Sequence, residues 1–74
     1  MGRVIKMYCV DVSNDESEFE LRFEVGGKVV DKEVVYSFDD VLYISYEFFK
    51  KNCEKYNFDG RFDTLEVSIN KRYN

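Results

Sequence analysis

Apolar and polar residues alternate strictly in the segment Phe19–Val25, which reads Phe-Glu-Leu-Arg-Phe-Glu-Val. A period of two residues is typical of a strand with one buried face and one face in water. Gly26 and Gly27 follow, and a Gly-Gly pair suits a two-residue hairpin turn because both central residues need positive φ. The pattern therefore predicts a hairpin whose second strand runs from Lys28 to about Phe38.

Counting outward from the turn predicts the register of this hairpin. Arg22 should face Asp31 on one side, and the core side should hold the pairs Phe23 with Val30, Leu21 with Lys32 and Phe19 with Val34. The core row of the second strand then consists of Val30, Val34, Tyr36 and Phe38, interrupted by Lys32. An inward lysine protects a sheet edge, so we expect this strand at an edge, with a β-bulge near Lys32 as the alternative.

The segment Val4–Val12 is apolar on both alternations, which is typical of an interior strand with both faces at least partly covered. Residues 13–17 are polar and predict a hairpin loop. A symmetric loop would place Cys9 opposite Leu21 and Met7 opposite Phe23. The core side should then carry Ile5, Met7 and Cys9, and the opposite side Tyr8, Val10 and Val12.

Apolar residues recur at helical spacing from Asp39 to about Tyr56. Ser37 is the expected N-cap, with Asp40 three residues on and two acids in the first turn, where the helix dipole favours them. Asn57 and Gly60 tolerate a left-handed cap and should end the helix. Its buried side should carry Val41, Leu42, Ile44, Ser45, Phe48, Phe49, Asn52, Cys53 and Tyr56, with Phe48 central and Phe49 toward the edge.

A last strand is predicted from Thr64 to about Asn70, with Leu65, Val67 and Ile69 inward. A helix that leaves the third strand crosses back over the sheet, and the doubly apolar first strand needs a neighbour on each side. We therefore expect a single α+β domain over residues 1–74 with the order β-β-β-α-β. Its four-stranded, mainly antiparallel sheet should have the order 3-2-1-4, with one helix on one face.

The composition suits a small folded domain. A chain of 74 residues buries only about 60% of its unfolded surface, and seven Phe and six Tyr supply large core side chains. No apolar run approaches the roughly 20 residues that span a bilayer, and no signal pattern is present, so a cytoplasmic protein without membrane contact is expected. The two cysteines are expected to be buried small apolar residues.

Catalytic and metal-binding motifs are missing from the sequence. The absence of His removes His-based catalysis and imidazole metal sites, and no phosphate-binding glycine motif occurs. Asp39 and Asp40 suit a first helical turn. Neither of the two acidic loops, residues 14–16 and 59–63, has the spacing of a calcium-binding EF-hand. Catalysis by Tyr or Lys would need a cleft, which is hard to build on this fold. We expect no enzyme, metal or cofactor.

The net charge of −4 is unevenly distributed, because the segment Asp11–Glu24 alone has a net charge of −5. Neutralising phosphates dominates nonspecific nucleic-acid binding, so nucleic acid is not an expected partner. On the predicted register the sheet face away from the helix has an apolar centre with an acidic rim, which is typical of a protein interface. The centre is Tyr8, Val10 and Val12, with Val29 and Val35 nearby, and the rim is Glu18, Glu20, Glu24, Asp31, Glu33 and Glu66.

Two other interpretations of the surface stay open. Half-exposed Val and Tyr are also simply good strand formers. The outer side of the helix, with Tyr43 and Tyr46 beside Lys50, is a second candidate surface, because Tyr is enriched in binding hot spots.

Small, acidic single domains without Pro, His or a catalytic signature resemble the stand-alone proteins that phages encode to block host nucleases or other defence complexes. The resemblance implies an inhibitor in the host cytoplasm. We therefore expect a non-enzymatic protein-binding domain whose acidic sheet face docks on a basic protein. The alternatives are a structural homodimer, through two open faces or two edge strands, and a single-stranded nucleic-acid binder that stacks bases on Tyr8.

Overall fold

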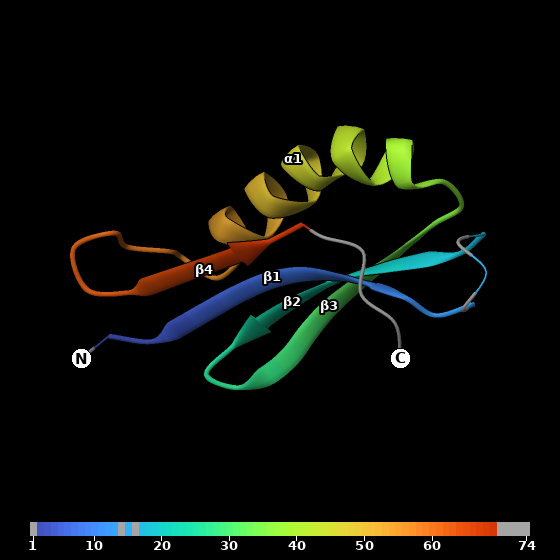
Figure 1. The fold of residues 1–74 in the computed structure, drawn as a ribbon. Coiled ribbons are helices and arrows are strands. Elements are labelled where there is room, and N and C mark those ends of the chain that lie inside the picture. Colours follow the sequence, from blue (N-terminus) through green and yellow to red (C-terminus); the bar gives the residue numbers. More distant parts are fainter. Residues whose placement is uncertain (1, 14, 16, 70–74) are drawn as a thin grey trace.

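The computed structural model of the protein describes residues 2–13, 15 and 17–69. Their elements are strands β1 (Val4–Asp11), β2 (Phe19–Val25) and β3 (Lys28–Val35), helix α1 (Phe38–Lys55) and strand β4 (Thr64–Ser68). The strands form one sheet of order β3-β2-β1-β4, in which only the β1–β4 pair is parallel. Helix α1 packs on one face of this sheet (Figure 1). The predicted α+β fold, element order and sheet order are confirmed.

The register between β1 and β2 is the predicted one. Met7 pairs with Phe23 and Cys9 with Leu21, and all four side chains are buried beneath α1. Burial raises the pKa of the Cys9 thiol, with the Asp11 carboxylate adding to the shift. Cys9 and the half-buried Cys53 are both free thiols, so they fit the expected role as small apolar residues.

The β2–β3 hairpin follows the prediction only for its first pairs. Gly26 and Gly27 have φ of +61° and +83°, which confirms the glycine turn. Phe23 then pairs with Asp31, and Val30 has no partner on β2. The predicted Phe23–Val30 pair is wrong, and the β-bulge is confirmed at Val30. Strand β3 is an edge strand, as expected.

The bulge reverses which side chains of the rest of β3 face the helix, because one extra residue shifts the two-residue alternation by one position. Val35 is 2% exposed and belongs to the core, whereas Val34 is 45% exposed. Lys32 pairs with Arg22 and is exposed, so the expected inward lysine is wrong. Tyr36, 71% exposed, also leaves the predicted core row.

Asp31 and Glu33 consequently face α1 and not the open sheet face. Asn52, fully buried on α1, donates from Nδ2 to Asp31 Oδ2 at 3.0 Å and to the Phe48 carbonyl at 2.9 Å. Lys51 Nζ lies 3.3 Å from the same Asp31 oxygen and 4.0 Å from Glu33 Oε1. Burial opposes the charge of Asp31, but the hydrogen bonds from Asn52, the Lys32 amide and Lys51 prevail and hold its pKa below the ordinary value.

The apolar core lies between α1 and strands β1 to β3. Phe48 is 1% exposed and meets the Phe23 ring edge-on at 6.4 Å between centroids, while Phe49 is only partly buried. Their predicted positions, central and peripheral, are confirmed. Leu42 was expected in the core but is 57% exposed, and the prediction is wrong because α1 packs mainly on β2 and β3.

The ends of α1 lie where the sequence places them. Ser37 is the N-cap and its carbonyl accepts from the Val41 amide at 3.1 Å, but its side chain makes no capping hydrogen bond, so the expected side-chain cap is wrong. Asp39 and Asp40 occupy the first turn. Asn57, with φ of +54°, follows the C-cap residue in the left-handed conformation.

The two neighbouring valines of β3 test the bulged register. Val35→Asp should reduce the free energy of unfolding by roughly 3 kcal/mol or more, because it buries an unpaired carboxylate. Val34→Asp, on the exposed side, should cost about 1 kcal/mol or less. Urea unfolding of both variants measures the difference. If Val34→Asp proved the more destabilising of the two variants, the result would contradict the bulge and support the register without it.

The central position of Phe48 makes a second test. Phe48→Ala should reduce the free energy of unfolding by about 3–5 kcal/mol, because it opens a cavity beneath the middle of α1. Tyr43→Ala is the control, since that side chain is 84% exposed on the same helix. Thermal and urea unfolding report both, and equal stabilities of the two variants would contradict the core described here.

Candidate functional site

Two hollows lie beside β4, one on each face of the sheet. The hollow on the open face has a volume of about 320 Å³ and is lined by Lys6, Met7, Tyr8, Glu24, Glu66 and Ser68. The hollow between α1 and β4 has a volume of about 270 Å³ and is lined by Met7, Ser45, Tyr46, Phe49, Val67 and Ile69. We call the second the α1–β4 groove. The lining of the first hollow is mainly polar and that of the α1–β4 groove is mainly apolar, so the two hollows suit ligands of different polarity.

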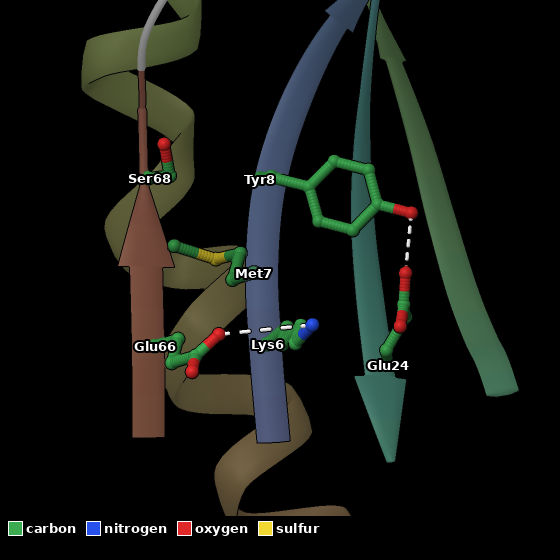
Figure 2. A pocket seen from close by; sticks show the side chains of 6 residues that line it. All are labelled: Lys6, Met7, Tyr8, Glu24, Glu66 and Ser68. Carbon is green, nitrogen blue, oxygen red and sulfur yellow. Dashed lines mark hydrogen bonds and ion pairs between the residues drawn. The ribbon is translucent and has the colours of Figure 1, made fainter. Parts of the chain in front are cut away.

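Figure 2 shows the polar hollow, whose side chains come from β1, β2 and β4. The Tyr8 hydroxyl donates to Glu24 Oε2 at 2.5 Å, and Lys6 Nζ lies 3.7 Å from Glu66 Oε2. Burial, together with the hydrogen bond to Glu24, raises the pKa of Tyr8. Tyr8 therefore remains a neutral hydrogen-bond donor at physiological pH and is unsuited to act as a base or nucleophile.

The open face lacks the exposed apolar centre that the sequence predicted. Val10 is only 6% exposed, and Tyr8 is half-buried with its hydroxyl on Glu24. Glu20 is bound to Arg22 Nε at 2.7 Å, so part of the predicted acidic rim is neutralised. Val35, Asp31 and Glu33 were also expected here and lie on the helix side, because of the bulge in β3.

Two predicted site residues lie at the loop that joins β1 and β2. The Val12 amide donates to the Glu18 carbonyl at 3.1 Å, and the Glu18 amide donates to Ser13 Oγ at 3.1 Å. Ser13 in turn donates from its amide and its hydroxyl to Oδ1 of the buried Asp11. Val12 and Glu18 thus close the loop and are partly buried, whereas the predicted site residues Tyr43 and Tyr46 lie on α1 and are exposed.

The α1–β4 groove is the feature that the sequence interpretation missed. Val67 was expected in the core; it is 50% exposed, although its neighbours Leu65 and Ile69 pack against core residues. The reason is that α1 packs mainly on β2 and β3. Tyr46, 64% exposed, lines the groove, and Leu42 continues it along the same side of α1 at helical spacing. Tyr43, 84% exposed on α1, is not among the residues that line the groove.

The sequence did contain a signal for this groove. A helix is about 10 Å wide, and strands are spaced about 4.8 Å apart, so one helix covers about two strands of a four-stranded sheet. The last strand is nevertheless apolar on its helix side, through Leu65, Val67 and Ile69. An apolar row that a single helix cannot cover indicates a surface suited to contact with another structural element.

An ion-pair cluster holds the start of β4 in place. Asp63 accepts from the Arg3 amide at 3.0 Å, from Arg3 Nη2 at 2.9 Å and from the Asp59 amide at 2.9 Å. The Thr64 amide then donates to the Arg3 carbonyl at 2.8 Å, which begins the pairing with β1. The Arg3 side chain, and after it the two amides, hold the pKa of Asp63 well below its usual range.

The described part of the chain was also compared with the requirements of a metal site and of a membrane-spanning helix. Within residues 2–13, 15 and 17–69, no three His, Cys, Asp or Glu side chains gather closely enough to hold a metal ion. Over the same residues, no helix has the length and apolar character needed to cross a membrane. Comparison of the chain with protein-family models, with curated proteins and with solved structures gave no match.

The Arg3–Asp63 cluster predicts a pH dependence of stability. Because the pKa of Asp63 is lower in the folded than in the unfolded chain, its contribution is complete above about pH 4 and is lost as the pH falls toward the folded value. Asp63→Asn should therefore lower the melting temperature at pH 7, and its difference from the parent should shrink below about pH 4. Thermal melts across this range measure the effect.

Glu54→Gln, at an exposed position of α1, is the matched control and should follow the parent at every pH. A difference between Asp63→Asn and the parent that persists unchanged in acid would show that the carboxylate charge is not what holds β4.

Proposed function

We propose that the protein is a non-catalytic protein-binding domain that receives another protein chain in the α1–β4 groove. The observation that carries this proposal is Val67, half exposed on the helix side of β4, with the exposed Tyr46 of α1 lining the same groove. Val67 and Tyr46 are both at least half exposed, yet they line the groove together with the core residue Met7. Contiguous exposed apolar surface next to a well-packed core is typical of an interface.

The energetics favour a covering partner. Complete burial of one Val or Leu side chain stabilises by about 1.5–3 kcal/mol, so covering a half-exposed one contributes roughly 1 kcal/mol. Tyr46 adds a large, rigid side chain with a polar tip, as is common in binding hot spots. None of the described residues that line the groove is charged, so a partner can contact them without desolvating a charge.

The polar hollow supports a binding role less well. Its acids already have partners on the same sheet, Lys6 for Glu66 and the Tyr8 hydroxyl for Glu24. The same contacts weaken the nucleic-acid alternative, since Tyr8 is half-buried with its hydroxyl on the Glu24 carboxylate and is a poor stacking platform. Docking of a basic protein on the acidic face, and an inhibitor role, stay predictions from the sequence.

Site-specific photocrosslinking tests the proposal. The crosslinking amino acid p-benzoylphenylalanine replaces Tyr46 in the groove or, as the control, Tyr36, which is 71% exposed but lies after β3. Irradiation in the cells that carry the gene should give a covalent adduct with a protein chain from position 46 and not from position 36. Adding Val67→Lys to the position-46 protein should abolish the adduct. Equal yields at the two positions would overturn the proposal.

A further inference from the structure

We propose that the chain received in the α1–β4 groove is a second copy of this protein, joined by antiparallel pairing of the two β4 strands with Val67 on the two-fold axis. This inference rests on the proposed function, because it names the occupant of the same groove. Four features of the described residues support it: the contrast between the two sheet edges, the direction of the β4 backbone groups, the self-complementary side chains, and the position of the acidic segment.

The two edges of the sheet differ in how they resist pairing. Strand β3 has a bulge at Val30 and exposed lysines at positions 28 and 32, all of which hinder the addition of another strand. Strand β4 pairs with β1 without a register shift, and Glu66 is its one charged residue. Proteins protect an edge that stays open to water, so the unprotected β4 edge is suited to being covered.

The backbone of β4 directs its outward-pointing groups at the residues that strand pairing requires. The Thr64 amide donates to the Arg3 carbonyl, so it points toward β1. Backbone groups alternate between the two edges of a strand, so those of Leu65 and Val67 point away from β1. In an antiparallel pair centred on Val67, the two valines exchange both hydrogen bonds, and Leu65 faces Ile69 of the second copy.

The side chains complement themselves in this register. On the helix side, Leu65, Val67 and Ile69 meet the same three residues in reverse order, and the two-fold axis puts both helices on that side. Tyr46 and Phe49 of each copy then cover the joined apolar row. On the open side, Glu66 faces Ser68 of the second copy. A shift that centres the pair on Glu66 would instead oppose two carboxylates, which is unfavourable.

The charge distribution suits antiparallel pairing. The acidic residues Asp11, Asp15 and Glu18 lie at the end of β1 and in its connection to β2, and β1 runs parallel to β4. Antiparallel copies therefore carry these three acids at opposite ends of the joined sheet. Each copy still has a net charge of −4, so salt should strengthen the dimer by screening their repulsion.

Sedimentation equilibrium of the full chain tests the dimer at protein concentrations from about 10 μM to 1 mM. We expect a monomer–dimer equilibrium whose Kd falls between about 0.05 M and 0.5 M salt. Val67→Lys should raise the Kd by about tenfold or more, because it places two like charges on the axis. Val34→Lys is the matched control, since Val34 is also about half exposed but lies on β3, and it should keep the parent Kd. Circular dichroism confirms that both variants are folded.

A disulfide scan tests the register without relying on a disruptive charge. In a Cys53→Ser background, Val67→Cys should form a disulfide-linked dimer with diamide, because paired residues at this position lie about 5.5 Å apart between Cα atoms. Leu65→Cys, which faces position 69 of the second copy, should remain monomeric on a non-reducing gel.

The outcomes separate this inference from the proposed function. A parent that stays monomeric to about 1 mM, with groove-dependent photocrosslinks to another protein, would overturn the second copy as occupant and leave the proposed function standing. A dimer that is insensitive to Val67→Lys, that weakens with salt, or that forms a disulfide more readily with Leu65→Cys than with Val67→Cys would place the contact elsewhere and overturn the inference. Absence of both the dimer and the position-46 adduct would overturn both.

Discussion

The width of one helix relative to four strands governs this structure. A helix is about 10 Å wide, whereas the outer strands of a four-stranded sheet lie about 14 Å apart, so α1 cannot cover every strand. Phe48 and Val41 of α1 bury themselves against β2 and its neighbours, where Phe19, Leu21 and Phe23 supply the largest apolar surface. The helix side of β4 is consequently left open, and the α1–β4 groove exists because of that mismatch.

The polar cluster beneath α1 helps to determine which strands of the sheet the helix covers. Asn52 is fully buried and reaches Asp31 on β3, and Lys51 joins both Asp31 and Glu33. Asn52 Oδ1 accepts no hydrogen bond from any described residue, so this contact is retained at some energetic cost. Breaking it would leave further buried polar groups unpaired. The cluster therefore favours a helix held toward β3, with the apolar side of β4 uncovered.

The two faces of β4 have separate roles in this arrangement. The Arg3–Asp63 cluster and the pairing with β1 hold the strand in register. On the open face, the Lys6–Glu66 and Tyr8–Glu24 contacts satisfy charges and donors within the sheet itself. The exposed apolar side chain of Val67 and the outer edge of β4 thus both lie beside the α1–β4 groove.

The sequence by itself determined the elements, their order, the sheet order and the core faces of β1 and β2. These features depend on local periodicity, on the positive φ that Gly26 and Gly27 supply, and on crossover rules that hold for any chain. The centrality of Phe48 was also predictable, because a period of 3.6 residues places it in the middle of the apolar stripe.

Only the tertiary structure decided the bulge, the sideways position of α1 and the location of the candidate site. Val34 and Val35 are both apolar, so periodicity could not tell which one is buried, and the contact of Asp31 with Asn52, 21 positions away in the chain, accompanies the choice. The burial of Val10 and the exposure of Leu42 and Val67 likewise depend on which elements come to lie over them. Such contacts join distant parts of the chain, and a local pattern does not record them.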